Sequence, residues 1–428
     1  MDFREFSASA HHIAIHGVIP RRLLAAALLT LGVTAGCSPE APPGPALEQV
    51  LELQRSAIVI DTHSDTTPWF EDPDWDFSAR HSQGHMDLPR IREGGLDAQF
   101  WSIYMGKTEG KGVAIRQAIE RIDAVHEMVA RHPDQVEQAY TAADIRRIVR
   151  SGKLASLMGL EGGHIIEDSL RALRTFYRLG VRYMTLTHSF NTNWADSSGT
   201  NEVPEPTHGG LTDFGRDVVR EMNRLGMMVD VSHVSDDTFW AVMEVSQAPP
   251  LASHSSTRAI ADHPRNMSDD MLRALADRGG VIMINFYSGY IDTSLIDASR
   301  RNFQKLRPVM ELLRDELDGD PFELRRAISE LYAESPFPQA PLAVLLDHFD
   351  HAIRVAGPDH VGLGSDWDGV PSMPTGLEDV SKLPRLTQGL LQRGHSRDTV
   401  VKVLGANLLR VMEETERVAR RLRDAGDS

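Results

Sequence analysis

Residues 57–65 read AIVIDTHSD, an apolar run that ends in a cluster of polar side chains. Its length and its β-branched composition are typical of a buried strand in a parallel sheet. His63 and Asp65 are two residues apart, so in extended backbone their side chains point to the same side. The stretch therefore predicts a strand whose carboxyl end presents two potential metal ligands.

The same pattern recurs along the chain, with short apolar runs alternating with longer amphipathic segments. The runs predicted as strands are 57–61, 98–104, 154–160, 182–187, 227–232, 251–253, 281–286 and 360–364. Helical periodicity is clear between several of them, at 113–130, 170–179, 214–225 and 342–355. Alternating βα units of this number predict an α/β fold, a (β/α)8 barrel of the TIM type.

An open doubly wound sheet is the alternative fold. No glycine-rich phosphate-binding motif follows a predicted strand, which argues against the nucleotide-binding version of that sheet. Residues 292–338 are charged and have helical character. We interpret them as a helical excursion after the seventh strand and not as a separate domain.

Polar residues with metal-ligating or acid-base chemistry follow six of the predicted strands. Besides the pair on the first strand, they are Glu161, His188, His233, His254 and Asp366. In a (β/α)8 barrel, the carboxyl ends of all strands lie on one face, where active sites are built. General loop polarity does not account for such a set, so the sequence predicts a metal site on this face.

Three imidazoles and two carboxylates form the predicted ligand set: His63, Asp65, Glu161, His233 and His254. This mixture suits Zn²⁺, with Mn²⁺ or Co²⁺ as substitutes. Five ligands are too many for one catalytic zinc that keeps a position open, so we expect two ions that share Glu161. A water held between two cations loses a proton near neutral pH and becomes a nucleophile.

The N-terminal region predicts an exported protein. Arg21 and Arg22 precede an apolar run at 23–33, and small residues follow up to Cys37, as in a secretory signal. This region resembles a bacterial lipobox, which implies lipidation of Cys37 and anchoring in the cell envelope of a bacterium; ordinary signal-peptide cleavage nearby is the alternative. We expect a signal peptide at 1–37, a Pro-rich tether at 38–50 and a metal-dependent barrel domain at 51–420.

The composition of the chain argues against two classes of binding partner. The formal net charge is −16, which argues against nucleic acid and against an anionic membrane surface. Contact with a membrane is thus expected only through the lipid anchor. Cys37 is the single cysteine, so the chain cannot form an intramolecular disulfide and its own core must hold the fold.

Several long stretches resemble the membrane (renal) dipeptidase family of zinc peptidases, within the amidohydrolase-like metal-dependent barrels. They are IDTHSDT at 60–66, LEGGH at 160–164, MTLTHSFNTNWAD at 184–196, LGMMVDVSHVS at 225–235, SHSSTRAI at 253–260, INFY at 284–287 and GLGSDWDGVPSMPTGLEDVSKLP at 362–384. The resemblance extends from about residue 55 to residue 412. It implies a binuclear zinc barrel that hydrolyses dipeptides. A dipeptide is thus the expected partner, and a second copy of the chain is a further candidate.

The resemblance also implies roles for single residues. It gives the same five metal ligands, with the glutamate as the bridge. His188 would contact the substrate and stabilise the oxyanion, Asp366 would shuttle a proton to the leaving amine, and Tyr287 would line the substrate pocket. Arg265 would hold the terminal carboxylate; Arg258 lies closer in sequence to the preceding ligand, so this assignment depends on the resemblance alone.

Two other functions remain open from the sequence. One is a different hydrolase on the same barrel, such as a cyclic-amide or phosphotriester hydrolase. Many of those bridge their metals with a carboxylated lysine, and no lysine of this chain directly follows a predicted strand in the matching place. The other is a non-catalytic, zinc-binding surface lipoprotein, which retention of the full ligand set and Asp366 argues against.

Overall fold

The structure is a computed structural model that describes residues 45–200, 202–317 and 320–426. The predicted signal peptide, Cys37 and the tether up to residue 44 lie outside the described residues. Helix α1 (Leu47–Ser56) begins within the range expected to be a tether, so residues 47–50 are helical instead. The physical reason is that Val50 and Leu53 of this helix are buried against the rest of the fold.

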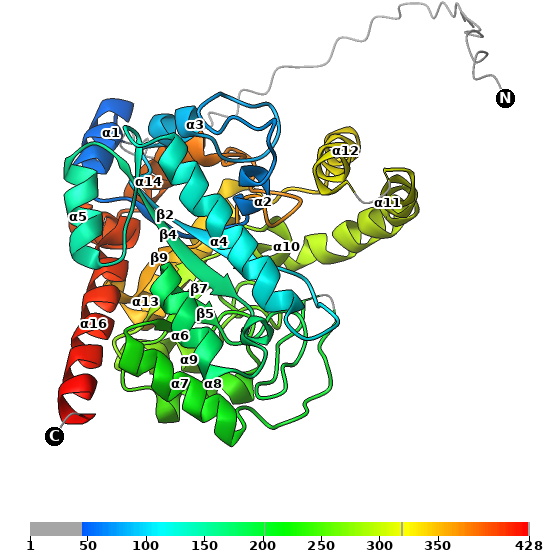
Figure 1. Cartoon of the computed structure of the whole chain (residues 1–428). Coiled ribbons are helices and arrows are strands. Elements are labelled where there is room, and N and C mark those ends of the chain that lie inside the picture. Colours follow the sequence, from blue (N-terminus) through cyan, green and yellow to red (C-terminus); the bar gives the residue numbers. More distant parts are fainter. Residues whose placement is uncertain (1–44, 201, 318–319, 427–428) are drawn as a thin grey trace, which may run out of the picture. The chain divides into compact units, whose positions relative to one another are not determined.

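Eight parallel strands close into a barrel, with helices between them (Figure 1). The barrel strands are β1 (Ile60–Ser64), β2 (Ala98–Tyr104), β4 (Leu154–Glu161), β5 (Val181–Thr185), β6 (Met228–Asp230), β7 (Leu251–Ser255), β8 (Val281–Ile284) and β9 (Val361–Leu363). They pair in the order β2-β1-β9-β8-β7-β6-β5-β4, and pairing of β2 with β4 completes the ring. The predicted (β/α)8 barrel is therefore confirmed, and the open sheet is excluded.

One short strand was not predicted from the sequence. β3 (Val136–Gln138) pairs with the first residues of β4, before the pairing of β4 with β5 starts at Met158. It lengthens the sheet outside the ring. A strand of three residues with a single buried apolar side chain carries too little periodicity to be recognised.

The helices that cover the barrel alternate with the strands, as predicted. The predicted helical segments correspond to α4 (Val113–Arg131), α6 (Leu170–Leu179), α7 (Asp213–Leu225) and α13 (Leu342–Ala356). The remaining helices around the barrel include α2 (Thr67–Phe70), α3 (Leu88–Gly94), α5 (Ala142–Arg150), α8 (Asp236–Val245), α9 (Asp269–Asp277), α14 (Leu383–Gln392), α15 (Arg397–Val401) and α16 (Asn407–Gly426). Within the described ranges, no helix has both the length and the apolar composition needed to cross a bilayer.

The excursion after the seventh barrel strand is helical, as predicted. It consists mainly of α11 (Ile296–Glu316) and α12 (Pro321–Glu334), which project from one side of the barrel (Figure 1), and the short helix α10 (Ser288–Ile291) precedes it. Two arginines of α12 fix it to the segment that follows β1. Arg326 pairs with the buried Asp72 at 2.7 Å, and Arg325 donates to the carbonyl oxygen of Pro68 at 2.6 Å.

Side chains alternate between two apolar layers along the barrel strands. Phe100 and Leu157 belong to the cluster inside the barrel, together with Tyr183. Their neighbours Trp101 and Met158 belong to the cluster between strands and helices. Because successive side chains point to opposite faces, both faces of each strand pack against apolar neighbours, and polar side chains occur at the carboxyl ends.

His348 on α13 is a buried histidine that the fold keeps neutral. Its Nδ1 accepts from the Thr257 N–H at 3.1 Å, and its Nε2 lies 2.9 Å from the carbonyl oxygen of Ile291. Burial lowers the pKa of His348 to about 4. An unfolded histidine titrates near pH 6.5, so the unfolded chain takes up the proton first, and stability is lost as the pH falls from 6.5 toward 4.

We therefore expect His348→Asn to flatten the pH dependence of stability, because asparagine keeps an acceptor for Thr257 but does not titrate. Between about pH 7 and pH 5, wild type should lose about 2 kcal/mol more of its free energy of unfolding than the variant. Urea unfolding at the two pH values measures this difference. Equal losses in both proteins would contradict the assignment.

Candidate metal centre and active site

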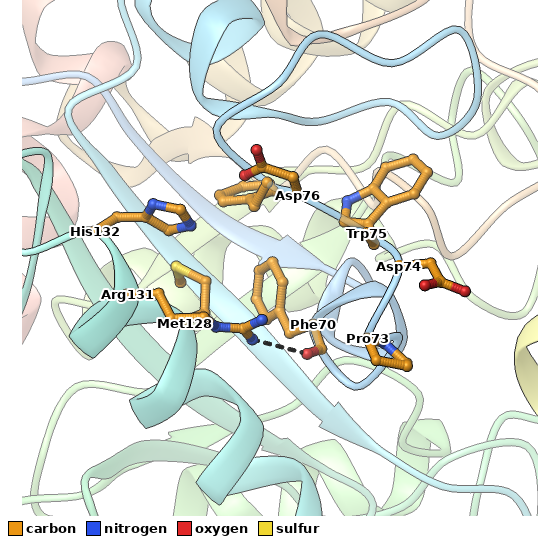
Figure 2. A pocket seen from close by; sticks show the side chains of 9 residues that line it. Phe70, Pro73, Asp74, Trp75, Asp76, Met128, Arg131 and His132 are labelled. Carbon is orange, nitrogen blue, oxygen red and sulfur yellow. Dashed lines mark hydrogen bonds between the residues drawn. The ribbon is translucent and has the colours of Figure 1, made fainter.

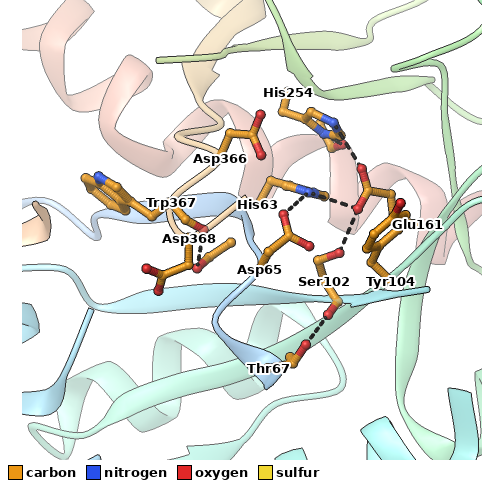
Figure 3. Close-up of polar contacts among 12 residues, drawn as sticks. His63, Asp65, Thr67, Ser102, Tyr104, Glu161, His254, Asp366, Trp367 and Asp368 are labelled. Carbon is orange, nitrogen blue, oxygen red and sulfur yellow. Dashed lines mark hydrogen bonds and ion pairs between the residues drawn. The ribbon is translucent and has the colours of Figure 1, made fainter. Parts of the chain in front are cut away.

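Glu161, the last residue of β4, lies at the centre of the predicted ligand set (Figure 3). Its Oε1 is 3.2 Å from Nε2 of His233 and 3.5 Å from Nε2 of His254. Its Oε2 is 3.4 Å from Nε2 of His63, and the same nitrogen lies 3.4 Å from Oδ2 of Asp65. The structure thus brings all five predicted ligands together at the carboxyl ends of the barrel strands.

The arrangement of nitrogen atoms fits a bound cation. Nε2 of His63 is buried and has no hydrogen-bond partner among the described residues. Nε2 of His233 and Nε2 of His254 are only 2.8 Å apart. Imidazole nitrogens that converge on one carboxylate, without enough donors between them, are typical of ligands for a divalent ion.

The protonation states of the buried histidines agree with such a role. Burial lowers the pKa of His233 and of His254 well below the ordinary value, and the nearby Arg265 adds to this effect. Both imidazoles are therefore neutral, and a histidine must be neutral to coordinate a metal. His233 also has a positive φ of 64°, a conformation rare outside glycine that places its ring in the cluster.

Glu161 and His63 form an ion pair within the cluster. Burial by itself raises the pKa of Glu161, but the charge of His63 and the close contacts with the other two histidines bring that pKa well below its usual range. Burial lowers the pKa of His63, but Tyr183 and Glu161 raise it well above its ordinary value. A cation bound here would replace the proton on His63.

Asp366 follows β9 and faces the same cluster. Its backbone N–H donates to the His63 carbonyl oxygen at 3.1 Å, and its Oδ2 accepts from Nδ2 of Asn285 at 2.8 Å. Burial raises the pKa of Asp366 to about 7. A Cβ at Gly369 would lie 2.2 Å from Asp65 Oδ2 and 2.5 Å from Asp366 Oδ1, so only glycine leaves room for both carboxylates.

His188 lies on the more open side of the cluster. Its Nε2 is 3.6 Å from Oε1 of Glu161, and its ring centroid is 4.3 Å from that of His233. The side chain is 16% exposed, whereas those of His63 and His254 are 0% and 1% exposed. His188 is thus close enough to the ligands to act on a substrate placed over them.

Arg265 is buried beside the cluster with most of its donors unused. Its Nη2 donates to the carbonyl oxygen of His254 at 3.1 Å, but Nε and Nη1 have no hydrogen-bond partner among the described residues. Arg258, the alternative in the sequence, instead pairs with Asp236 on the surface at 2.7 Å. A buried guanidinium with free N–H groups is a site for an anion.

Tyr287 is half-buried just before α10, and its N–H donates to Oδ1 of Asn285 at 2.6 Å. Its ring contacts Tyr290 edge-on at 4.7 Å. Tyr290, not Tyr287, has its ring 5.5 Å from the guanidinium of Arg265. Tyr290 was not predicted as a site residue; it lies in α10, three residues after Tyr287, and this spacing is a signal that could have identified it.

Polar residues within the strands support the predicted ligands and were not predicted from the sequence. Ser102 on β2 donates from Oγ to Oε2 of Glu161 at 2.9 Å (Figure 3). Tyr183 and Ser253 contact His63 and His254 at 2.9 and 2.8 Å. A signal was present, because all three are polar residues within predicted strands, where a buried polar group needs a hydrogen-bond partner.

A separate cavity of about 210 Å³ lies away from the ligand cluster (Figure 2). Its lining residues are Phe70, Pro73, Asp74, Trp75, Asp76, Phe77, Met128, Arg131 and His132. None of the predicted site residues lines it. The cavity is therefore distinct from the ligand cluster, and its arginine donates to the carbonyl oxygen of Phe70 at 3.1 Å.

Comparison with known proteins agrees with the geometry. Residues 47–426 match the model of the membrane dipeptidase family (peptidase family M19). Dipeptidase verJ of Clonostachys rogersoniana is 35% identical over 396 residues, which cover 89% of this chain and 90% of that protein. The resemblance stated from the sequence is therefore confirmed.

Solved structures are similar over most of their length. The probable dipeptidase PvdM from Pseudomonas aeruginosa aligns with a TM-score of 0.73 at 28% identity, covering 87% of this chain and 99% of that one. A metallo peptidase from Rhodobacter sphaeroides, liganded with a phosphinate mimic of the dipeptide L-Ala-D-Ala, aligns with a TM-score of 0.67 at 25% identity, covering 84% and 99%. The chain belongs to the membrane dipeptidase family of metallopeptidases and is a metal-dependent dipeptidase.

Proposed function

We propose that the chain is a binuclear zinc dipeptidase that cleaves short peptides with a free C-terminal carboxylate. The observation that carries this proposal is the central position of Glu161, whose two oxygens face different histidines. One oxygen faces His63 and the other faces His233 and His254. A carboxylate shared in this way suits a bridge between two divalent ions.

The remaining ligands divide into two pairs around this bridge. His63 and Asp65 meet at 3.4 Å and would complete one set of ligands. His233 and His254 meet at 2.8 Å and would complete the other. Nitrogen and carboxylate donors favour zinc, with Mn²⁺ or Co²⁺ as substitutes. The ions would polarise the scissile carbonyl and lower the pKa of the attacking water.

Two side chains of this chain would act on the reacting atoms. His188, on the open side of the cluster, would donate a hydrogen bond where negative charge develops on the carbonyl oxygen. Asp366 would hold a proton and pass it to the leaving amine, which needs a carboxyl group with a raised pKa. Asn285 would orient this carboxyl group through its 2.8 Å hydrogen bond.

Arg265 would select the substrate class. Its buried and unpartnered Nε and Nη1 can pair with a carboxylate in two parallel hydrogen bonds. A peptide held by its C-terminal carboxylate next to the metals can extend by few residues, which favours dipeptides. Because a structural relative is liganded with a mimic of L-Ala-D-Ala, we include dipeptides with a C-terminal D-residue among the substrates.

Two further proposals concern the cellular location and the oligomeric state of the protein. The signal-like segment before Cys37 supports export and lipid anchoring in a bacterial cell envelope, and a homodimer stays a prediction. Of the alternative functions, a different amide hydrolase would have no need of the buried Arg265. A non-catalytic zinc-binding lipoprotein would have no need of the raised pKa of Asp366.

A dipeptide panel tests the proposed function. Zinc-loaded protein should hydrolyse L-Ala-L-Ala and L-Ala-D-Ala, and should act poorly on the same dipeptides with an amidated C-terminus. Elemental analysis should give two zinc ions per chain. Two bound ions without cleavage of any dipeptide would favour the binding lipoprotein, and equal cleavage of acids and amides would favour another amide hydrolase.

A further inference from the structure

Two of the predicted ligand histidines are held through their second ring nitrogen by a hydroxyl group, one from another strand of the barrel and one from the preceding residue. His63 Nδ1 lies 2.9 Å from Oη of Tyr183, and His254 Nδ1 lies 2.8 Å from Oγ of Ser253. In each imidazole, the opposite nitrogen, Nε2, faces Glu161. Whether each Nδ1 carries a proton therefore decides whether the opposite Nε2 is free to coordinate a metal ion.

The direction of the hydrogen bond at Tyr183 follows from a count of protons. The phenol has a single O–H, which donates to the carbonyl oxygen of Thr62 at 3.0 Å. A carbonyl oxygen can only accept. Oη must therefore accept from His63, so His63 carries a proton on Nδ1 and Nε2 is the nitrogen free to coordinate.

Tyr183 reaches His63 because β4 has a glycine beside it. Tyr183 on β5 pairs in register with Gly159 on β4, and a Cβ at Gly159 would lie 1.9 Å from the tyrosine ring. The ring thus lies against the bare backbone of β4 inside the barrel, and it also contacts Phe100 with ring centroids 5.5 Å apart. Any other residue at 159 would displace the phenol.

The same count applies to His254. Oγ of Ser253 donates its single proton to Oδ2 of Asp230 at 2.6 Å. This buried carboxylate also accepts from Thr185 Oγ1 at 2.5 Å and from the N–H groups of Ser232 and Ser253 at 3.0 and 2.8 Å. Ser253 Oγ is then left to accept from Nδ1–H of His254, which again leaves Nε2 for coordination.

His233 provides a contrast within the same cluster. Its Nδ1 is buried but has no hydrogen-bond partner among the described residues. Its ring is placed by the backbone instead, through the positive φ of 64°. Among the three histidines of the cluster in the described structure, those from β1 and β7 are therefore the ones whose rings contact side-chain hydroxyls.

We infer that Tyr183 and the Ser253–Asp230 pair are positioning residues for the metal centre, because they keep a proton on Nδ1 of His63 and His254 and direct both Nε2 atoms to the metals. This inference rests on the proposed binuclear centre and adds to it. Hydrogen-bonded partners of ligating histidines fix ring orientation and raise ligand basicity, and their loss weakens metal binding about 10- to 100-fold.

Zinc affinity of two variants tests the inference without reference to activity. Tyr183→Phe keeps the ring and removes the phenol oxygen, and Ser253→Ala removes the serine hydroxyl. We expect each to bind zinc about 10- to 100-fold more weakly in competition with a chelating dye. In proton NMR spectra of the zinc-loaded protein, wild type should show a hydrogen-bonded imidazole N–H signal for each histidine, and each variant should lose one.

Ser156→Ala is the matched control, because Ser156 is a buried barrel serine that contacts no ligand. Its Oγ accepts from Trp101 Nε1 at 3.0 Å and donates to Gln138 Oε1 at 3.1 Å. It should retain wild-type zinc affinity and both N–H signals. An equal loss of affinity in this control would overturn the inference, since the effect would then be general destabilisation.

Two other results separate the inference from the proposed function. Zinc affinity within about twofold of wild type in both Tyr183→Phe and Ser253→Ala would overturn the inference and leave the dipeptidase proposal intact, because the expected loss is at least about tenfold. Failure of the wild type itself to bind zinc would overturn the proposed binuclear centre. Melting temperatures of the metal-free proteins show whether each variant is folded.

Discussion

Glu161→Gln is expected to remove one or both metal ions and to abolish dipeptide hydrolysis. The substitution removes the negative charge that faces His63, His233 and His254 together. Loss of one partner from a buried charged cluster costs about 3–5 kcal/mol. This corresponds to roughly 10²- to 5 × 10³-fold weaker metal binding, and elemental analysis after dialysis measures it directly.

Glu167→Gln is the matched control for this experiment. Glu167 lies six residues further along the same segment and accepts the N–H of Gly112 at 2.6 Å, at the start of α4. It contacts none of the histidines of the cluster in the described structure. The control should keep two ions per chain and wild-type kcat/KM. Retention of two ions with unchanged affinity in Glu161→Gln would show that Glu161 does not bridge them.

The sequence could predict that the candidate ligands lie close together, because the carboxyl ends of all strands of a parallel barrel lie on one face. Each of the eight strands ends on the same face, so His63, Glu161 and His254 had to be neighbours although 191 residues separate the first from the last. The apolar runs identified the strands, and the polar residue after each run identified the face. No side-chain geometry was needed for this step.

The support for those ligands could not be predicted in the same way. Tyr183 reaches His63 only because β5 pairs with β4 in a register that sets Tyr183 opposite Gly159. Strand register depends on packing between segments far apart in sequence, and a shift of one residue would turn Tyr183 to the outer face. Likewise, the neighbour of Arg265 is Tyr290 and not Tyr287, a difference set by the single turn of α10.

The pKa shifts of the buried carboxyl groups in the site could not be predicted from the sequence either. Asp366 and Glu161 are both buried carboxyl groups, but burial raises the pKa of Asp366 to about 7, whereas the imidazole neighbours of Glu161 keep its pKa well below the usual range. Two carboxyl groups with opposite shifts can divide ligand and acid roles between them. This division depends on distances that only the folded chain defines.

Arg265→Met is expected to remove the preference for a free C-terminal carboxylate. The guanidinium is 3% exposed and leaves Nε and Nη1 for an anion, whereas methionine has a similar length but no charge. Loss of one partner of a buried charge pair costs about 2–5 kcal/mol in binding. We therefore expect kcat/KM for L-Ala-L-Ala to fall roughly 30- to 5 × 10³-fold, with a much smaller effect on the amidated dipeptide.

The ratio of the two kcat/KM values distinguishes this role from a structural one, since a folding defect would lower both values together. Zinc binding should be unchanged, and the free variant should melt at a higher temperature than wild type, because an unpaired buried charge is costly to stability. Arg258→Met is the control: that guanidinium pairs with Asp236 at 2.7 Å, so its loss should leave the ratio as in wild type. If this ratio is unchanged in Arg265→Met, another residue binds the carboxylate of the substrate. Arg265 would then be a structural cation held by the carbonyl oxygen of His254.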